Sequence, residues 1–258
     1  MKQVEIKGAR VPAIGLGTWQ LSGRTCREAV RQALELGYRH IDTAEMYGNQ
    51  AEVGRAIRDS LVDRAEIFLT TKVPPGKLRA RDAKRSAEES LRQLGLAHVD
   101  LLLIHWPSSE VPLGETLGAF AELRAAGKTR FIGVGNFNAR LLSEAVERHG
   151  ADLLCNQVEY HPYLSQRPVL DAVRRHGMML TAYSPVARGR AAGDAVLQAI
   201  GRKYDKSAAQ ITLRWLVEQD RVAAIPKAAR RVHLAANIDI FDFALSADDR
   251  ARIDQLQN

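Results

Sequence analysis

The sequence predicts a closed barrel of eight parallel strands wrapped by helices, with a short β-hairpin in front of it. Three observations lead to this fold class: eight short apolar runs, amphipathic segments between them, and a length of 258 residues. Strands that alternate with helices form parallel sheets, and eight such repeats close into a (β/α)8, or TIM, barrel. That barrel commonly takes about 250 residues, so we expect residues 1–258 to form a single domain.

The expected strands are short, apolar and spread over the whole chain. They span residues 13–17, 39–42, 67–72, 99–105, 130–135, 154–159, 179–184 and 222–227. The leading stretch VEIKGARV holds a Lys-Gly pair that suits a tight turn. We therefore expect a hairpin there that covers the bottom of the barrel.

Amphipathic stretches with apolar residues three or four positions apart fill the intervals. Ser207 and Ser246 are suitable N-caps for two of them, and Gly37 and Gly95 follow the ends of two others. The expected helices span residues 26–36, 51–61, 82–94, 114–126, 141–150, 169–177, 195–204, 207–219 and 246–256.

Composition argues against several classes of protein. The two cysteines, Cys26 and Cys155, are far apart, as in a reduced cytoplasmic protein. No apolar run reaches the roughly 18 residues of a membrane span. The formal charge of +7 is scattered over many segments, with no basic patch interleaved with aromatic residues. We expect no membrane or nucleic-acid partner, and a monomer, because no helix shows an unusual apolar stripe.

Polar side chains end most of the predicted strands. Active sites of TIM barrels lie at the carboxyl ends of the strands, so these side chains are candidate site residues. Turns favour Gly, Asn, Asp and Ser, whereas a lysine after two threonines and a histidine after LLLI are less expected. The strand ends are Asp42, Lys72, His105, Gly135-Asn136, Gln157 with Glu159, Tyr183-Ser184 and Lys227.

Three successive strand ends, together with Tyr47, form a candidate proton-donating centre. A free tyrosine has a pKa near 10, and a nearby ammonium such as Lys72 would lower it by stabilising the phenolate. A buried lysine needs a carboxylate to stay charged, and Asp42 would supply it. Tyr47 would be the general acid and His105 a hydrogen-bond partner for a carbonyl oxygen. Alone, each residue also fits a structural role: a strand-end cap, a rim aromatic, a snorkelling lysine or a core histidine.

Seven motifs extend this pattern over nearly the whole chain. They are GYRHIDTAEMYGNQAEVG, LTTKV, LLLIHWP, GVGNF, NQVEYHP, AYSPVARG and IPKAARRVHLAANI. In this order they resemble the signatures of the aldo-keto reductase superfamily, and the compact length resembles its bacterial 2,5-diketo-gluconate and methylglyoxal reductase branch. The resemblance implies an NADPH-dependent reductase of small carbonyls, such as 2-oxoaldehydes or keto-sugar acids. It maps the catalytic tetrad onto Asp42, Tyr47, Lys72 and His105.

The resemblance also implies a binding site for the coenzyme. Asn136 and Gln157 would hold the nicotinamide carboxamide, and Tyr183 would stack on the ring. The chain lacks the G-x-G-x-x-G fingerprint, so the dinucleotide would lie extended over the barrel rim. The remaining implied contacts are Ser184, Pro185 and Val186 at the pyrophosphate, Lys227 at the adenosine 2′-phosphate and Asn237 at the adenine.

Four positions depart from the family pattern. They are Gly135 and Ala228 in place of serines, His233 in place of an arginine that clamps the 2′-phosphate, and Ala236 in place of a glutamate near the adenine. A neutral imidazole holds phosphate less well than a bidentate guanidinium, so Arg230 or Arg231 would have to reach it instead. We therefore predict a weakened preference for NADPH, with NADH accepted.

Aromatic and sulfur side chains near the predicted rim would wall a substrate pocket. Trp19, Met46 and Trp106 are the main candidates, and Phe137 is a weaker one. A tail that covers the pocket in longer relatives is expected to be missing after Asn258. The predicted pocket is therefore open and suited to small carbonyls.

Other functions fit parts of the pattern. A Schiff-base aldolase would use Lys72 as its nucleophile, although it needs no pairing of Asp42 with Tyr47. A regulatory barrel would bind NADPH without turnover, although the complete tetrad argues against it. A metal-dependent hydrolase is disfavoured, because the seven histidines form no H-x-H or H-x-x-x-H pair, and we expect no metal site.

Overall fold

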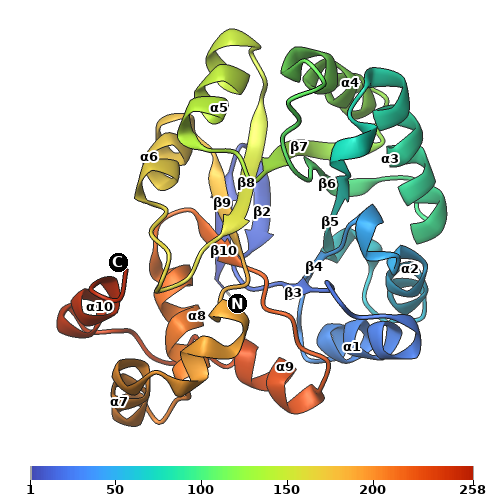
Figure 1. The fold of residues 1–258 in the computed structure, drawn as a ribbon. Coiled ribbons are helices and arrows are strands. Elements are labelled where there is room, and N and C mark those ends of the chain that lie inside the picture. The colour runs from blue at the N-terminus through green and yellow to red at the C-terminus, as the bar shows by residue number, and fades with distance from the viewer. Residues whose placement is uncertain (1, 258) are drawn as a thin grey trace.

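The centre of the molecule is a ring of parallel strands, seen end-on in Figure 1 of the computed structural model, which describes residues 2–257. The strands follow the order β10-β9-β8-β7-β6-β5-β4-β3. The two ends of this sheet meet, because Ile14 pairs in parallel with Ala224 and the amide of Gly15 donates to the carbonyl of Ala224 at 2.9 Å. The sheet is therefore a closed barrel, and the predicted fold class is confirmed.

All eight predicted strands are present, with ends that differ by a few residues from the prediction. Their side chains alternate between the barrel interior and the surrounding helices, as the period of two requires. The strands are β3 (Leu16–Gly17), β4 (His40–Asp42), β5 (Phe68–Val73), β6 (Val99–Ile104), β7 (Thr129–Gly135), β8 (Leu153–Glu159), β9 (Met179–Tyr183) and β10 (Val222–Ala224).

Helices cover the outside of the barrel on all sides (Figure 1). The predicted caps hold: the Ser207 side chain accepts from the amide of Gln210, and Ser246 accepts from Asp249. The helices are α1 (Gly23–Glu35), α2 (Gln50–Arg58), α3 (Ala80–Leu94), α4 (Leu113–Ala125), α5 (Ala139–Ser143), α6 (Arg167–Arg175), α7 (Ala195–Tyr204), α8 (Ala208–Glu218), α9 (Arg231–Ile238) and α10 (Ala247–Asp254).

Two helical segments differ from the sequence-based prediction. Helix α9 was not predicted, and Leu234 is its one buried residue, so its sequence carries almost no apolar stripe. The predicted helix over 141–150 divides into α5 and a π-helical turn at Glu144–Arg148. Both differences arise where amphipathic periodicity is weak or interrupted.

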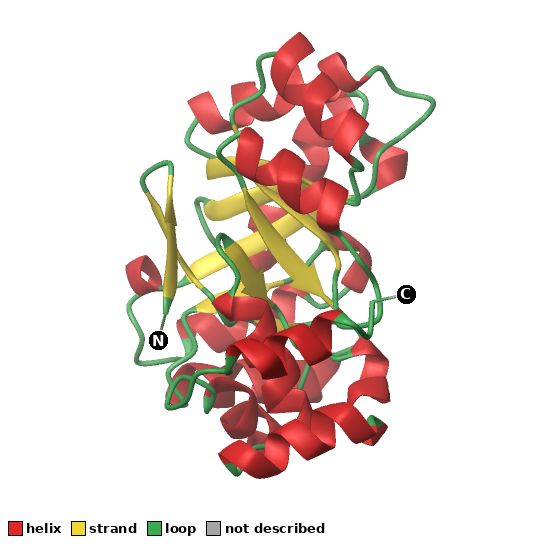
Figure 2. Ribbon diagram, turned by 90° about the vertical axis from the view of Figure 1, so that its left-hand side faces the viewer, coloured by secondary structure: helices red, strands yellow, loops and turns green. Residues whose placement is uncertain are grey.

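The predicted hairpin lies at the end of the barrel where the strands begin, beside the sheet in Figure 2. It consists of β1 (Gln3–Ile6) and β2 (Ala9–Pro12), which are antiparallel. Its turn residues Lys7 and Gly8 have φ of 49° and 76°, the two positive values that a type I′ turn needs. Val4 and Val11 of the hairpin pack with side chains inside the barrel, such as Leu101 and Met179. The hairpin therefore closes the bottom of the barrel and leaves the opposite rim for a site.

A second, larger core lies between the barrel and its helices. Outward-facing strand residues such as Ile41, Leu69 and Leu102 are buried there against the apolar faces of the helices. Cys26 and Cys155 are both buried free thiols, and burial raises the pKa of each to about 12. No helix within residues 2–257 is long and apolar enough to cross a membrane.

Candidate active site

A buried ion pair lies at the rim of the barrel. Lys72 Nζ is 2.5 Å from Asp42 Oδ1, and each side chain is 1% exposed. The same ammonium donates to the carbonyl of Thr43 at 2.9 Å and to the hydroxyl of Tyr47 at 3.3 Å. Lys72 therefore links the carboxylate to the phenol by direct hydrogen bonds.

Strand register explains why these side chains meet. Asp42 is the last residue of β4 and pairs with Thr70 on β5. Lys72 is two residues beyond Thr70, so it faces the same side of the sheet, one step closer to the rim. Tyr47 ends the 3-10 turn Glu45–Tyr47, which Gly48 closes at a φ of 63°. That turn folds the phenol back over the end of β5.

His105 completes the group from the next strand. It follows β6, and its amide donates to the carbonyl of Val73 at 3.0 Å. Its ring lies edge-on to Tyr47, with 5.7 Å between ring centroids. Its Nδ1 is buried and has no hydrogen-bond partner among residues 2–257. Burial, aided by the charge of Lys72, lowers the pKa of His105 to about 4, so the imidazole is neutral near pH 7.

The protonation states differ in one respect from the sequence-based prediction. We expected the ammonium to lower the pKa of Tyr47 below its ordinary value. Burial raises that pKa, Asp42 adds to the rise, and Lys72 offsets only part of it, so the net shift is upward. Burial alone would lower the pKa of Lys72, but its contacts with Asp42 and Tyr47 raise it overall. The phenol is thus protonated and the lysine charged at neutral pH.

Two amide side chains lie beside this group. Asn136 donates through Nδ2 to the carbonyl of His105 at 2.9 Å and accepts from the Tyr183 hydroxyl at 2.9 Å. Gln157, on β8, donates through Nε2 to Asp42 Oδ2 at 2.7 Å. Asn136 has a φ of 63°, a conformation that Asn tolerates better than most residues. The amides, the tyrosine ring and the tetrad thus surround the barrel mouth.

The backbone explains why glycine stands at position 135. A Cβ on Gly135 would lie 2.7 Å from the carbonyl oxygen of His105 and 3.2 Å from that of Ile104. Both neighbours are backbone atoms of the adjacent strand, so they cannot move aside cheaply. Glycine at position 135, where the family pattern has serine, therefore lets β7 lie close against His105, the residue that follows β6.

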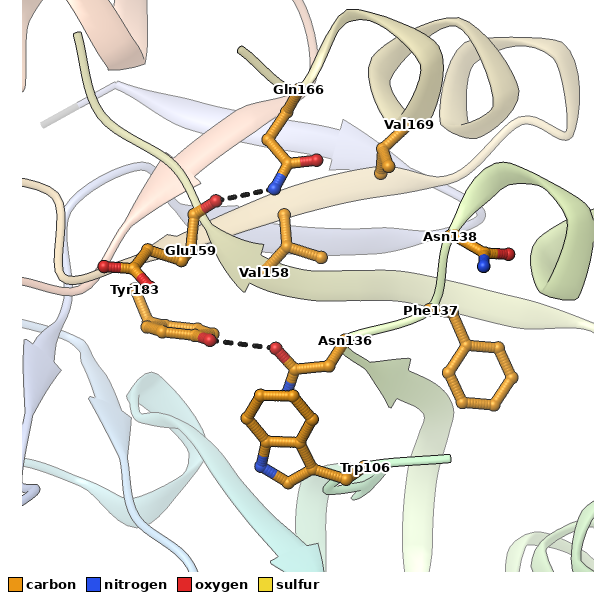
Figure 3. Close-up of a pocket in the computed structure, with 9 residues that line it drawn as sticks. All are labelled: Trp106, Asn136, Phe137, Asn138, Val158, Glu159, Gln166, Val169 and Tyr183. Carbon is orange, nitrogen blue, oxygen red and sulfur yellow. Dashed lines mark hydrogen bonds between the residues drawn. The ribbon is translucent and has the colours of Figure 1, made fainter. Parts of the chain in front are cut away.

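A cavity of about 240 Å³ opens next to Asn136 and Tyr183, as Figure 3 shows. Trp106 forms one wall of it, and Val158 and Val169 form another. Of the three predicted substrate-pocket residues, Trp106 is the one that lines this cavity; Trp19 is 44% exposed and Met46 is 61% exposed. Phe137 also lines the cavity but is only 1% exposed.

The residues predicted to contact the pyrophosphate lie in the segment directly after β9. Ser184 has a φ of 47°, and Pro185 and Val186 follow it into the turn Ala187–Gly193. The exposed guanidinium of Arg188 lies 5.9 Å from the ring centroid of Trp19. The turn therefore reaches the loop after β3 at the rim.

The predicted adenosine end of the coenzyme site gathers around α9. Arg230, the N-cap of α9, contacts the Nε2 of His233; a guanidinium can only donate, so the imidazole nitrogen is the acceptor. Arg231 is committed elsewhere, because it pairs with Glu35 at 3.0 Å. Lys227 is exposed, and neither it nor Arg230 has a carboxylate partner within residues 2–257. Asn237 is half-buried near the end of the helix.

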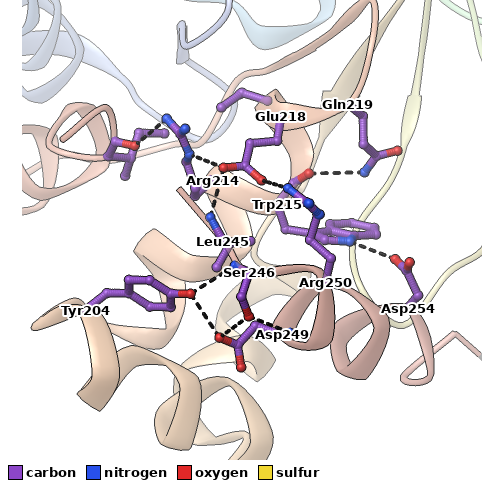
Figure 4. A network of polar contacts seen from close by, with 12 residues as sticks. Tyr204, Arg214, Trp215, Glu218, Gln219, Leu245, Ser246, Asp249, Arg250 and Asp254 are labelled. Carbon is purple, nitrogen blue, oxygen red and sulfur yellow. Dashed lines mark hydrogen bonds and ion pairs between the residues drawn. The ribbon is translucent and has the colours of Figure 1, made fainter. Parts of the chain in front are cut away.

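Another network of polar contacts lies on α7, α8 and α10, away from the tetrad (Figure 4). Asp249 accepts from Tyr204 at 2.9 Å and pairs with Lys203 at 2.6 Å. Burial opposes ionisation of Asp249, but these hydrogen bonds lower its pKa overall. Trp215 donates to Asp254 at 2.8 Å. These contacts attach α10 to the barrel, and the sequence analysis did not anticipate them.

Within residues 2–257, no three or more His, Cys, Asp or Glu side chains are grouped to hold a metal ion.

Comparison with known proteins defines the class. The family model described as "Aldo/keto reductase family" matches residues 13–258. A family match over this length, together with relatives named as reductases, shows that the protein is an oxidoreductase. The chain belongs to the aldo/keto reductase family, whose members use nicotinamide cofactors.

Individual relatives resemble the chain over nearly all of its length. It is 40% identical to methylglyoxal reductase DkgB of Salmonella typhimurium, over 94% of this chain and 92% of that protein. It is 39% identical to morphine 6-dehydrogenase of Pseudomonas putida, over 96% of this chain and 88% of that protein. A crystal structure assigned as 2,5-diketo-D-gluconic acid reductase B matches with a TM-score of 0.98 and 48% identity, over 100% of this chain and 92% of that one.

Proposed function

We propose that the protein reduces small aldehydes and ketones with NADPH, using Tyr47 as the proton donor, and that it also accepts NADH. One observation carries this proposal: Lys72 lies between Asp42 and Tyr47, at 2.5 Å and 3.3 Å. A lysine held charged beside a protonated phenol is what a general acid for a developing alkoxide requires. The names of the relatives, which include a methylglyoxal reductase, support the substrate class.

The residues around the barrel mouth fit a nicotinamide. The Tyr183 ring is half-buried and faces the cavity beside Asn136, whose amide offers polar groups next to it (Figure 3). The exposed cations Lys227 and Arg230 would hold the phosphate at the far end of an extended dinucleotide. When bound, NADPH would supply a hydride to the carbonyl carbon.

The chain's own side chains would do the rest of the work. Tyr47 would donate its proton to the carbonyl oxygen as negative charge develops there. Lys72 would stabilise the phenolate left behind, and Asp42 keeps that lysine charged. The neutral imidazole of His105 would donate a hydrogen bond to the same oxygen and so fix its position. The cavity of about 240 Å³ beside Trp106 suits a small carbonyl compound.

The coenzyme preference follows from the groups around α9. Arg231 is paired with Glu35, which leaves Lys227 and Arg230 as the cations for a 2′-phosphate. The Nε2 of His233 is already engaged with Arg230, so this nitrogen is not free to donate to a phosphate. We therefore propose a preference for NADPH that is real but modest.

A Schiff-base aldolase fits the geometry less well. A nucleophilic lysine must be neutral and reachable, whereas Lys72 is 1% exposed and its pKa is raised by Asp42 and Tyr47 despite burial. Borohydride trapping of Lys72 with a substrate, in the absence of nicotinamide, would favour the aldolase instead.

The proposed activity is tested by mixing the protein with NADPH and methylglyoxal or a nitrobenzaldehyde and following absorbance at the nicotinamide band. We expect absorbance loss that depends on the carbonyl compound, and a slower loss with NADH. No loss with any member of a carbonyl panel, despite coenzyme binding, would instead support a regulatory barrel.

We further propose that residues 1–258 act as a single domain, as a monomer in the cytoplasm. Light scattering on a sizing column tests the oligomeric state, for which we expect a mass near the 28.5 kDa of one chain. A mass near twice that value would reject the monomer.

A further inference from the structure

Glu159 and Tyr183 lie next to each other at the mouth of the barrel. They are the last residues of β8 and β9, and they are paired in the register of these two strands. Paired residues of neighbouring strands project from the same side of a sheet. Gln157, two positions before Glu159, reaches Asp42 through the barrel interior, so this side faces the barrel mouth. The side chain of Glu159 therefore lies beside that of Tyr183 at the edge of the cavity (Figure 3).

Glu159 has a polar neighbour but no cation to neutralise it. Within residues 2–257, the one basic side chain that pairs with it is His161, whose Nε2 lies 3.5 Å from Glu159 Oε1. His161 Nδ1 accepts from the amide of Tyr163 at 3.2 Å, so the neutral ring carries its proton on Nε2, toward Glu159. Burial lowers the pKa of His161, although Glu159 opposes the shift, so the ring is neutral near pH 7. The contact therefore holds the carboxylate without adding a positive charge.

Two exposed arginines, Arg188 and Arg190, lie in the turn after β9. Neither pairs with Glu159, and the guanidinium of Arg190 is stacked on Tyr163, 3.8 Å from the ring centroid. Burial raises the pKa of Tyr183, the charge of Glu159 adds to the rise, and Arg188 offsets less than Glu159 adds. The negative charge of Glu159 therefore outweighs the positive charge of Arg188 at Tyr183.

The proposed reaction creates a positive charge in this place. The carbonyl carbon gains a hydride from the coenzyme, and the carbonyl oxygen gains the proton of Tyr47. The nicotinamide ring is neutral before the transfer and cationic after it, because the hydride leaves with its electron pair. A ring stacked on Tyr183 would carry this charge close to the carboxylate of Glu159, whose side chain is only 31% exposed. Opposite charges attract each other more strongly in such a place than in bulk water.

We propose that Glu159 stabilises the oxidised, cationic form of the nicotinamide and thereby makes bound NADPH a stronger hydride donor. This inference rests on the proposed function, because it requires a nicotinamide on Tyr183. The phosphates of the coenzyme are the same in both oxidation states, so their contacts cancel when NADP+ and NADPH are compared. Glu159 should therefore affect the ratio of the two affinities.

The first experiment measures the dissociation constants of NADP+ and NADPH by titration calorimetry. Glu159→Gln keeps the shape of the side chain and an oxygen that faces His161, but it removes the charge. It should weaken binding of NADP+ relative to NADPH by about fivefold, the effect of one charge several ångströms away in a partly hydrated site. Glu159→Asp keeps the charge and should retain most of the wild-type ratio, which separates loss of charge from damage to the site.

Asp194→Asn is the matched control. Asp194 accepts from the Tyr163 hydroxyl at 3.0 Å and caps α7, and the lining of the cavity does not include it. Asn is also a good N-cap, so this variant removes a negative charge and keeps the helix. Its ratio of affinities should stay at the wild-type value. A ratio that is unchanged in Glu159→Gln, or that changes equally in Asp194→Asn, would overturn the inference.

The second experiment follows hydride transfer in single turnovers in both directions. Reduction uses NADPH with 4-nitrobenzaldehyde, and oxidation uses NADP+ with 4-nitrobenzyl alcohol. Glu159→Gln should slow reduction and speed oxidation, each by about twofold, because the two rates share the change in the equilibrium between bound coenzyme forms. A purely structural role of Glu159 would slow both directions, so slowing in both would also overturn the inference.

The two experiments separate this inference from the proposed function. If neither NADP+ nor NADPH binds, the proposed function fails and the role of Glu159 fails with it. If both bind and carbonyl compounds are reduced, but Glu159→Gln keeps the wild-type ratio of affinities, the function stands and the role of Glu159 is rejected.

Discussion

Two buried carboxylates, Asp42 and Asp100, lie near opposite ends of the barrel and have different partners. Asp100, the second residue of β6, is held by Arg64 at 2.8 Å, by Arg130 at 2.9 Å and by the amide of Leu69 at 3.0 Å. The side chains of these two arginines are 22% and 53% exposed, so both reach Asp100 from the solvent side. The partner of Asp42 is a lysine that is 1% exposed and that also contacts a phenol.

The difference shows how the same ion-pair chemistry serves two purposes. Arginine stays charged under all ordinary conditions and binds carboxylates with a rigid fork, which suits a structural clamp. Lysine is a compact charge whose state depends on its surroundings, and here a proton donor lies beside it. We infer that Asp100 stabilises the lower part of the barrel, whereas Asp42 sets the charge next to Tyr47.

The largest expected effect comes from removing the lysine that pairs with Asp42, and the same kind of change at Asp100 serves as its control. Lys72→Met leaves Asp42 buried without its counter-charge, which should cost about 3–5 kcal/mol of unfolding free energy. It should also lower the reduction rate by about 10²–10⁴-fold, the usual contribution of a general acid.

Arg64→Met is the matched control at the other carboxylate. Asp100 keeps Arg130 and the Leu69 amide, so the loss should be about 1–2 kcal/mol, with kcat unchanged. Denaturant unfolding and steady-state kinetics on both variants check this. A large loss of kcat in Arg64→Met would remove the distinction between the two carboxylates.

The pH dependence of carbonyl reduction also distinguishes Asp42 from Asp100, and its expected effect is smaller. Tyr47 must be protonated to act as an acid, and its pKa lies above the ordinary 10.0 because burial and Asp42 outweigh Lys72. His105 must stay neutral, and its pKa is about 4. We expect kcat/KM for carbonyl reduction to be flat between these limits and to fall only above about pH 10.

Asp100→Asn should leave that profile unchanged, because Asp100 contacts none of the tetrad side chains. The measurement is kcat/KM across the pH range with one carbonyl substrate. A fall centred near neutral pH in the wild type would contradict the assigned protonation states.

The smallest effect concerns a charge at the edge of the site rather than in it. His233→Arg restores a guanidinium near Lys227 and Arg230, so the preference for NADPH over NADH should rise by about tenfold. The ratio of kcat/KM values for the two coenzymes measures it, and Arg231→Met, which removes an arginine paired with Glu35, is the control. A preference already very high in the wild type would reject the weakened-preference proposal.

Much of the fold could be predicted from the sequence because its signals are local. Each strand is a short apolar run, and Ser207 and Ser246 cap their helices as their sequences indicate. The tetrad residues could be selected because strand ends meet at one rim. Helix α9 could not be predicted, because Leu234 is its one buried residue and its sequence shows no apolar stripe.

The features of the site that the sequence analysis did not predict depend on distances between residues that are far apart in the chain. Gln157 and Asp42 are 115 positions apart, and their bond exists because β4 and β8 face each other across the closed barrel. The upward shift of the Tyr47 pKa also needs the structure, because burial outweighs the ammonium that the sequence analysis emphasised. A lysine near a tyrosine predicts a proton donor but not the balance of forces on it.

Tyr47→Phe tests the central claim most directly, because it removes one hydroxyl and retains the ring. With NADPH and methylglyoxal, we predict that the rate of reduction falls by at least about 10²-fold, while coenzyme affinity and thermal stability stay near wild type. A variant that retains most of its rate would contradict the account, because the proton would then have to come from another group.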